Sequence, residues 1–303
     1  MSMFTLLDGG MGRELKRIGA PFSQPLWSAQ ALIESPNHVR LAHQSFIDAG
    51  AEIITVNSYA CVPFHLGEAL YRSDGAKLAR LAAQIAAEAA QQAPHAVQVA
   101  GSIPPAMGSY RPDLFQAQPA QEITQTLYEA QDPYVDIWIA ETIASLEELS
   151  MIQQVLRQSS KPCYYSFTLQ DDSDVALLRS GESVSDAAQQ VAAAGGAGML
   201  FNCSVPEVMA DAISQAKSAL NGNENGNEKA IEIGVYANSF APIKADHAAN
   251  QTVQVMREFS AQDYVEFAKQ WYGLGATVIG GCCGITPAHI HALQDWRQEL
   301  EKS

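Results

Sequence analysis

Residues 276–287 read Ala-Thr-Val-Ile-Gly-Gly-Cys-Cys-Gly-Ile-Thr-Pro, and this stretch contains the three parts of a strand–turn–helix unit. Its first four residues are apolar or β-branched and predict a strand. A glycine-rich turn follows, and Thr286 then stands as a helix cap before Pro287 at the first helical position. The stretch therefore predicts a strand that passes through a tight turn directly into a helix.

The same alternation of short β-rich and longer helical segments runs along the whole chain, as expected for βα units around a parallel sheet. Eight strands are predicted, at residues 4–7, 52–56, 96–100, 135–139, 163–167, 198–201, 231–236 and 276–279. Eight such units over 303 residues predict an α/β fold, a closed (β/α)8 TIM barrel that forms a single domain over residues 1–303.

Several serines indicate where helices begin. Ser35 precedes a proline in the same way as Thr286. Ser145 with Glu148, and Ser204 with Glu207, have the spacing of a capping box, in which a serine and an acidic residue three positions later satisfy each other's backbone amides. We expect a helix to start at each of these points.

The connections between the predicted elements differ in character. Residues 76–90 are alanine-rich and predict an outer helix, and residues 193–198 are predicted to end one. Residues 221–228 are polar and low in complexity, and predict a surface loop on the face away from the active site. Residues 239–257 follow the seventh strand, so they are predicted to lie on the catalytic face.

The composition is that of an acidic globular protein. Hydrophobic residues make up 47% of the chain, which suits a large core. The 33 acidic and 18 basic side chains give a net charge of −15, which disfavours nucleic acid and anionic membranes as partners and favours a cationic ligand. The first residues lack a basic region, and no apolar run approaches a membrane span. We therefore expect a cytoplasmic protein.

Three of the five cysteines stand at predicted strand ends: Cys203 after the sixth strand, and Cys282 and Cys283 after the eighth. Zinc accepts thiolate ligands readily and is usually tetrahedral, so three sulfurs would leave one position for water or substrate, as in catalytic sites. The glycines around the adjacent pair would let both cysteines face one ion. Cys61 and Cys163 lack such surroundings and are predicted to be packing residues.

Two other interpretations of the three cysteines stay open. Cys282 and Cys283 could form a disulfide with each other, although such vicinal bonds are strained and uncommon. Alternatively, all three could be buried thiols that pack as small apolar residues. None of the seven histidines falls at a predicted strand end, so a metal site made of sulfur alone is favoured.

Two carboxylates, Asp8 after the first strand and Glu141 after the fourth, are predicted to face the same end of the barrel. The run from Asp8 through Gly9 and Gly10 could present backbone amides to an anion, but it lacks the lysine and the spacing of a phosphate loop. Alternatively, Asp8 and Glu141 could receive the ammonium group of an amino acid. Each carboxylate alone could also cap a helix or pair with an arginine.

Taken together, these motifs resemble the homocysteine S-methyltransferase family, the zinc-dependent thiol methyltransferase barrels. The likeness spans almost the whole chain and rests on Leu-Asp-Gly-Gly-Met-Gly at 7–12, Ile-Thr-Val-Asn-Ser-Tyr at 54–59, Ala-Glu-Thr-Ile-Ala-Ser-Leu-Glu-Glu at 140–148, Phe-Asn-Cys at 201–203 and Gly-Gly-Cys-Cys-Gly-Ile-Thr-Pro at 280–287. The cysteine motifs are the most specific of these.

The resemblance implies a zinc-dependent enzyme that methylates the thiol of homocysteine to give methionine. Cys203, Cys282 and Cys283 would bind Zn2+, and the substrate thiol would complete the coordination, so no further catalytic side chain is implied. The substrates would be small molecules. The implied substrate-binding residues are Asp8, Gly9, Gly10, Glu141, Asn202, Asn57 and Tyr59.

The methyl donor implied by the resemblance is S-methylmethionine or S-adenosylmethionine. The chain has no room for the folate and cobalamin modules of large methionine synthases. Residues 101–112 and 237–242 depart from the family pattern on the catalytic face, which leaves open another thiol or selenol as acceptor and betaine as donor. A separate alternative is a non-catalytic redox-sensing barrel in which Cys282 and Cys283 form a reversible bond.

Overall fold

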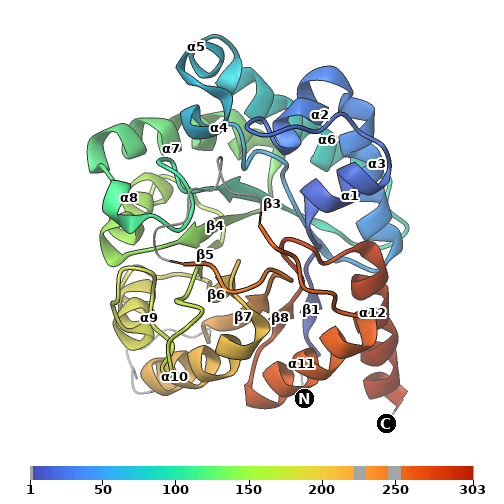
Figure 1. Ribbon diagram of the computed structural model, residues 1–303, viewed down its shortest axis with the longest axis vertical. Coiled ribbons are helices and arrows are strands. Elements are labelled where there is room, and N and C mark those ends of the chain that lie inside the picture. The colour runs from blue at the N-terminus through green and yellow to red at the C-terminus, as the bar shows by residue number, and fades with distance from the viewer. Residues whose placement is uncertain (1–2, 222–229, 245–253, 303) are drawn as a thin grey trace.

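The computed structural model describes residues 3–221, 230–244 and 254–302, and it contains one eight-stranded parallel sheet (Figure 1). The strand order is β1-β8-β7-β6-β5-β4-β3-β2, so every strand neighbours the next one along the chain. The strands are β1 Thr5–Leu6, β2 Ile53–Thr55, β3 Gln98–Ile103, β4 Ile137–Ile143, β5 Cys163–Phe167, β6 Gly198–Asn202, β7 Glu232–Tyr236 and β8 Val278–Ile279.

The sheet closes on itself between β1 and β2. Leu7 and Ile53 form a parallel bridge, the Asp8 amide donates to the Ile53 carbonyl over 3.0 Å, and the Glu52 amide donates to the Leu6 carbonyl over 2.8 Å. Closure leaves no free sheet edge, as in a barrel. The predicted single-domain (β/α)8 fold is therefore confirmed.

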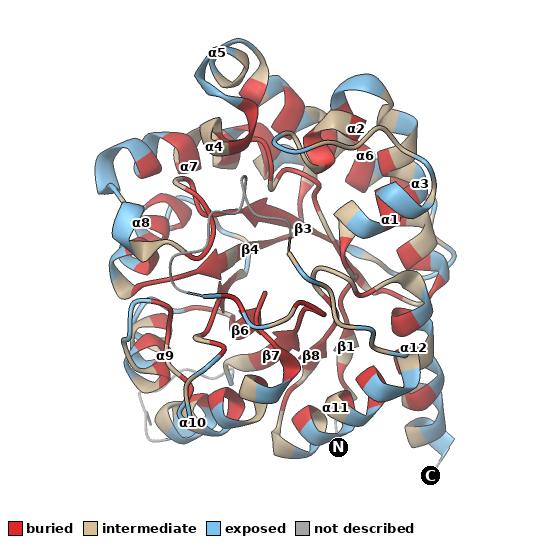
Figure 2. Cartoon of the chain, in the orientation of Figure 1, coloured by how far each residue is buried: buried red, intermediate tan, exposed pale blue. Residues whose placement is uncertain are grey.

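Helices form a ring outside the strands, with their buried residues facing inward (Figure 2). The α-helices are α1 Met11–Arg17, α2 Ser28–Glu34, α3 Pro36–Asp48, α4 Pro63–Leu66, α5 Glu68–Leu70, α6 Ala76–Gln91, α7 Ala117–Gln131, α8 Leu146–Leu156, α9 Val184–Ala193, α10 Met209–Asn221, α11 Ala261–Leu274 and α12 Pro287–Lys302. Short turns of π- or 3-10 helix occupy Tyr71–Gly75, Pro112–Leu114, Asp132–Tyr134 and Pro206–Val208.

The core has two apolar layers, one on each side of the sheet. The larger layer lies between strands and helices and includes Phe46, Trp138 and Trp271, all fully buried. The smaller layer fills the barrel interior and includes Leu200 and Val278. The interior is thus packed with side chains and is not a pore, so a site must be built at one of its ends.

The predicted strands all exist, but three of them extend further than expected. The prediction for β5 has the correct bounds, whereas β3 continues to Ile103, β4 to Ile143 and β6 to Asn202. The prediction that Glu141 follows its strand is therefore wrong, because it lies inside β4. The register between β4 and β5 shifts between Ala140 and Ile143, which is a bulge that redirects the strand end.

The capping-box prediction is half correct at Ser145 and wrong at Ser204. Ser145 accepts the Glu148 amide over 3.2 Å and caps α8, but the Glu148 carboxylate takes the Ala144 amide instead of closing the box. Ser204 accepts the Leu169 amide over 2.8 Å, and α10 begins only at Met209. A serine near a strand end has tertiary partners that the spacing rule does not consider.

The two proline signals mark helix starts, as predicted, although neither preceding hydroxyl caps in the expected way. Helix α3 begins at Pro36 and α12 at Pro287. The Ser35 hydroxyl lies 2.7 Å from His38 Nδ1, and the Thr286 hydroxyl lies 2.9 Å from His289 Nδ1. In each case the partner of the hydroxyl is a histidine side chain three residues later, where a capping hydroxyl usually accepts a backbone amide.

The connecting segments agree with the predictions where they are described. Helix α6 covers residues 76–91, and the 193–198 turn ends α9, with the Gly196 amide donating to Val191. Residues 239–244 and 254–257 form a short antiparallel ribbon after β7. Residues 222–229 and 245–253, parts of the two predicted loops, lie outside the described residues. In the part of the chain that is described, no helix combines the length and apolar character needed to cross a membrane.

Candidate metal centre and substrate site

The three cysteines meet at the carboxyl end of the barrel. Cys203 follows β6, while Cys282 and Cys283 follow β8, and the three sulfurs lie within 4.8 Å of one another. The structure pairs Cys203 with Cys282 as a disulfide, with Cα atoms 5.8 Å apart, and leaves Cys283 free. The alternative of a bond between Cys282 and Cys283 is therefore wrong.

Backbone contacts with neighbouring loops fix the cysteine pair in place. The Gly281 amide donates to the Asp8 carbonyl and the Cys282 amide to the Ala237 carbonyl, both over 2.9 Å. The Cys283 carbonyl accepts the Ser239 amide over 2.9 Å. A side chain on Gly281 would place its Cβ 2.1 Å from Ile285, so the turn can close only with glycine there.

The chemistry of this cluster fits a zinc ion. Within the described ranges, the group that could hold a metal consists of the three cysteines alone, without histidine or carboxylate. Three sulfurs satisfy three of the four positions that zinc prefers. Burial raises the pKa of the Cys283 thiol to about 11, so a nearby cation is needed to keep it a thiolate near neutral pH.

The other two cysteines lie apart from the cluster. Cys61 is fully buried in the core, where burial raises the pKa of its thiol to about 12. Cys163 opens β5, at the amino end of the barrel. Their predicted role as packing residues agrees with these positions.

Asp8 is a buried carboxylate at the seam between β1 and β2. Its Oδ2 accepts the Thr55 amide over 2.8 Å, and its Oδ1 accepts the Thr55 hydroxyl over 3.1 Å. Burial, assisted by the nearby charge of Glu141, raises the pKa of Asp8 from 3.8 to about 8. The carboxylate is held in place by hydrogen bonds, but its charge is not compensated.

Glu141 is the second carboxylate at this end and sits in the β4 bulge. Its Oε1 accepts the Ser102 hydroxyl over 2.6 Å. Burial raises the pKa of Glu141 from 4.5 to about 7. Among the described residues, neither Asp8 nor Glu141 forms an ion pair, so the alternatives of an arginine partner or a helix cap do not apply. A cationic group between them would relieve the cost of two buried charges.

Asn202 braces the β4 bulge and has its polar atoms occupied by the protein. Its Oδ1 accepts the Thr142 amide over 2.9 Å and the Ser166 hydroxyl over 2.8 Å. Its Nδ2 donates to the Thr142 hydroxyl over 2.9 Å. Thr142 has a left-handed backbone with φ of 59°, a conformation that a non-glycine residue adopts only under such support. Asn202 thus holds the residue next to Glu141.

Gly9 and Gly10 allow the first loop to pack against the cysteine loop. The Gly10 amide donates to the Ile285 carbonyl over 2.8 Å, and a Cβ there would lie 2.6 Å from the Cys282 carbonyl oxygen. A Cβ on Gly9 would lie 2.6 Å from the Ile285 carbonyl. The anion-binding interpretation of this loop is therefore wrong for Gly10, whose amide is already used.

The remaining predicted site residues, Asn57 and Tyr59, follow β2. Asn57 Nδ2 donates to the Ser28 carbonyl over 3.3 Å, which joins this loop to α2. The Tyr59 hydroxyl lies 2.7 Å from the Ser109 hydroxyl, and burial raises its pKa above the usual range. Both residues support the loops at the barrel mouth.

Several site residues could not be identified from the sequence. Thr55 donates to the Asp8 carboxylate, which lies 47 residues away in the sequence. Ser102 donates to the Glu141 carboxylate, 39 residues away. Tyr110 packs against the cysteines from the loop after β3. Their only sequence signal was their position near strand ends, which they share with many residues that play no part here.

Comparison with known proteins identifies the family. The sequence model of homocysteine S-methyltransferases matches residues 5–296. The chain belongs to the homocysteine S-methyltransferase family. A relative of this methyltransferase, the homocysteine S-methyltransferase of Escherichia coli strain K12, is 31% identical to it, with 95% of this chain and 94% of that protein aligned.

Two further comparisons cover the chain equally well. A selenocysteine methyltransferase of Astragalus bisulcatus is 26% identical, with 95% of this chain and 90% of that protein aligned. The crystal structure of the homocysteine methyltransferase MmuM of Escherichia coli in its metallated form superposes with a TM-score of 0.76 at 25% identity, over 97% of this chain and 96% of that one. The family and the enzyme class expected from the sequence are confirmed.

Proposed function

We propose that this methyltransferase transfers a methyl group to the thiol of homocysteine at a zinc ion held by Cys203, Cys282 and Cys283. The observation that supports this most is the convergence of three sulfurs at the end of the barrel that also holds two buried carboxylates without an ion pair among the described residues. A thiol centre beside an ammonium receptor suits a thiol-bearing amino acid.

In the active enzyme, a cellular thiol reductant would supply the two electrons that convert the Cys203–Cys282 bond into two thiols, and these with Cys283 would hold the metal. When bound, zinc supplies a coordination position at which a substrate thiol is kept as thiolate near neutral pH. The protein keeps the three sulfurs at fixed positions through the backbone contacts of Gly281, Cys282 and Cys283. A cytoplasmic location is proposed because reducing conditions preserve these thiols.

Asp8 and Glu141 hold the ammonium group of the acceptor. Thr55 and Ser102 donate to the two carboxylates and fix their orientation, while Asn202 holds the bulge that places Glu141. Gly9 and Gly10 let the first loop approach the cysteines closely. Asn57 and Tyr59 complete the mouth. Binding of its amino-acid end thus aligns the acceptor thiol, so little further loss of rotational and translational entropy is needed to bring the sulfur to the methyl group.

The methyl donor is a sulfonium, S-methylmethionine or S-adenosylmethionine. The thiolate sulfur forms a bond to the methyl carbon while the bond from that carbon to the donor sulfonium breaks, and the donor sulfur keeps the electron pair and becomes neutral. The net charge of −15 attracts a cationic donor. A selenol acceptor is the second candidate, favoured by the relative from Astragalus bisulcatus.

Product analysis with zinc-loaded, reduced protein tests the proposal. Homocysteine is incubated with S-methylmethionine, S-adenosylmethionine or betaine, and methionine is measured. We expect methionine with a sulfonium donor, loss of turnover in Cys283→Ala, and retention in Cys61→Ala, a matched control because Cys61 lies outside the cluster. Methionine from no donor would contradict the proposed reaction, and full activity of Cys283→Ala would contradict the ligand set.

A further inference from the structure

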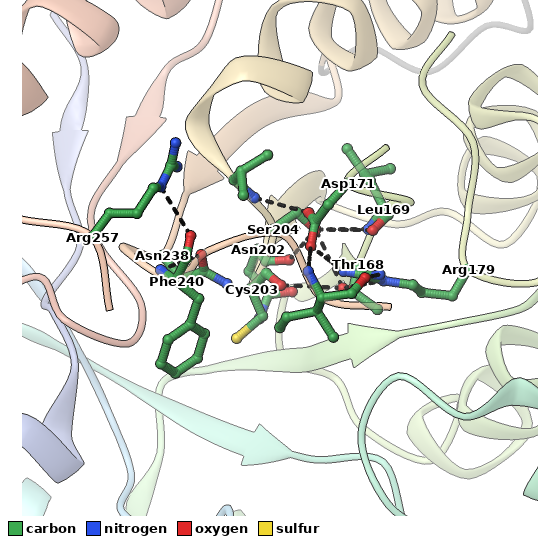
Figure 3. A network of polar contacts seen from close by, with 12 residues as sticks. Thr168, Leu169, Asp171, Arg179, Asn202, Cys203, Ser204, Asn238, Phe240 and Arg257 are labelled. Atoms are coloured by element: carbon green, nitrogen blue, oxygen red, sulfur yellow. Dashed lines mark hydrogen bonds and ion pairs between the residues drawn. The ribbon is translucent and has the colours of Figure 1, made fainter. Parts of the chain in front are cut away.

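A buried ion pair lies beside the sulfur cluster and belongs to neither the proposed metal site nor the ammonium site. Asp171 and Arg179 both stand on the loop after β5, with side chains 0% and 3% exposed and 2.8 Å between Oδ2 and Nη2. Figure 3 shows the pair and Cys203 within one network of polar contacts, in which Thr168 bonds to both Arg179 and the Cys203 carbonyl.

The pair connects three loops at the carboxyl end of the barrel. Asp171 accepts the Val205 amide over 3.0 Å and the Ile243 amide over 2.8 Å. Arg179 Nη1 donates to the Ile243 carbonyl over 2.8 Å. The backbone of Ile243 is therefore held at both its amide and its carbonyl, so the loop after β7 is fixed to the loops after β5 and β6.

The same arginine also holds a fourth loop through an aromatic ring. The Arg179 guanidinium lies 5.1 Å from the centroid of the Tyr110 ring, within the range of a cation–π contact. Tyr110 has φ of 69°, a left-handed backbone that a tyrosine keeps only when its surroundings hold it there. Tyr110, Phe240 and Ile243 pack with Cys203, and Cys282, Cys283 and Met256 border them.

Stability alone gives a poor account of this arrangement. A buried ion pair is often no more stabilising than apolar residues of the same volume, because both charges lose their hydration. Here every contact of the pair leads to a segment that borders the cysteines. The pair thus sets the shape of one apolar wall, formed by Tyr110, Phe240 and Ile243, which we call the aromatic wall.

We propose that Asp171 and Arg179 are positioning residues that hold the aromatic wall against the sulfur cluster, where it receives the methyl donor. This inference rests on the proposed methyl transfer. Because Asp8 and Glu141 are proposed to bind the ammonium group of the acceptor, we assign the aromatic wall to the binding of the donor. Transfer from a sulfonium to a thiolate disperses opposite charges, so a mostly apolar wall that excludes water suits the transition state.

The test measures donor and acceptor separately in zinc-loaded protein. In Arg179→Met we expect the KM for the sulfonium donor to rise at least about tenfold, because small displacements near reacting atoms are costly, while the KM for homocysteine and the zinc content stay within about twofold of wild type. Arg179→Lys should have a donor KM between those of wild type and Arg179→Met. A lysine ammonium keeps the charge, but it cannot bond to Asp171 and the Ile243 carbonyl together as the two arms of a guanidinium do.

Two further variants separate positioning from folding. Arg297→Met removes an arginine from its pair with Glu52 at the other end of the barrel, and we expect a lower Tm without a change in donor KM. Tyr110→Leu alters the wall and leaves the ion pair intact, and we expect it to raise the donor KM as Arg179→Met does. If Arg179→Met has no cooperative thermal transition, Tyr110→Leu decides.

The outcomes distinguish this inference from the proposed function. A wild type that turns over, with an unchanged donor KM in Tyr110→Leu and in folded Arg179→Met, overturns the aromatic wall alone. A wild type without turnover on any donor overturns the proposed function, and the wall falls with it. A rise in donor KM that Arg297→Met reproduces would also overturn it, since general loosening would then be the cause.

Discussion

The two ends of the barrel use acidic residues in opposite ways. At the amino end, Glu52 pairs with Arg297 and accepts the Leu6 amide, while Asp136 accepts the Val99 amide over 2.8 Å. At the carboxyl end, the donors to Asp8 and Glu141 among the described residues are neutral, so these residues do not compensate the two charges. The charge of Glu52 is therefore compensated within the protein, as is that of Asp171 by Arg179 at the carboxyl end, whereas no described residue of opposite charge pairs with Asp8 or Glu141.

A large cavity at the amino end lacks the chemistry of the proposed site. A cavity of about 920 Å³ opens at the amino end, beside the last turns of α8 and α9. Its described lining includes Ser159, Lys161 and Gly195 but no carboxylate. Uncompensated charge and convergent sulfur locate the site better than volume does.

Removal of the metal should produce the largest difference between the two ends. Chelation under reducing conditions is expected to lower turnover at least about 1000-fold, since zinc contributes several kcal/mol to thiol activation, and added zinc should restore it. Turnover and bound zinc are followed together. Undiminished turnover in protein shown to be free of metal would contradict the proposed role of the sulfur cluster.

Replacing one acid at each end should separate function from stability. Glu141→Gln removes a charge proposed to hold the substrate ammonium, which is worth about 2 kcal/mol and corresponds to roughly thirtyfold in homocysteine KM. Glu52→Gln should leave KM unchanged and lower the free energy of unfolding, because it weakens a partly buried pair. Steady-state kinetics and denaturant titration measure the two effects, and equal KM values in both variants would refute the distinction.

The pH dependence should reveal the same asymmetry. Burial raises the pKa of Glu141 to about 7 and that of Asp8 to about 8. The folded protein binds these protons more tightly than the unfolded chain does, so the free energy of unfolding of the ligand-free protein should fall as pH rises from about 4 through 8. Homocysteine KM should fall over pH 6 to 8 as the ammonium receptor ionises.

Glu141→Gln provides the control for this titration. It should be more stable than wild type at pH 8, because it carries no charge to bury, and this advantage should disappear near pH 5. Chemical denaturation at the two pH values measures the difference. A Glu141→Gln protein less stable than wild type at pH 8 would show that the charge is compensated.

The smallest effect is expected from a helix cap that contacts neither the cysteines nor the Asp8 and Glu141 carboxylates. Ser145→Ala removes the hydroxyl that caps α8 and should cost about 1 kcal/mol in the free energy of unfolding. Neither KM should change, although Ser145 follows β4 within a few residues of Glu141. A donor or acceptor KM that moved with this substitution would indicate that the β4 bulge depends on the helix it precedes.

The fold and the sulfur cluster could be predicted from sequence because their signals are local. Each strand has its own β-rich run, and the Gly-Gly-Cys-Cys turn directly follows β8. The β4 bulge could not be predicted, because it depends on Asn202, which bonds to Thr142 60 residues earlier in the chain. Ser204 misled for the same reason, since its partner is in another loop.

The Asp171–Arg179 pair shows the same limit more strongly. In sequence, Asp171 stands in a polar run, Gln-Asp-Asp-Ser-Asp at 170–174, that resembles any solvated loop. Its importance arises from burial and from an amide of Ile243 that lies 72 residues away. Spacing rules detect partners three or four residues apart, so contacts between loops after different strands remain invisible to them.

The Asp8 carboxylate links the closure of the barrel to the proposed substrate site. The same oxygens that accept the Thr55 amide and hydroxyl, where β1 and β2 join, are those proposed to receive the substrate ammonium group. An amino acid bound as proposed would therefore alter the hydrogen bonds that join β1 to β2. The Thr55 amide becomes a built-in reporter, whose exchange with deuterated solvent would change whenever an amino acid binds.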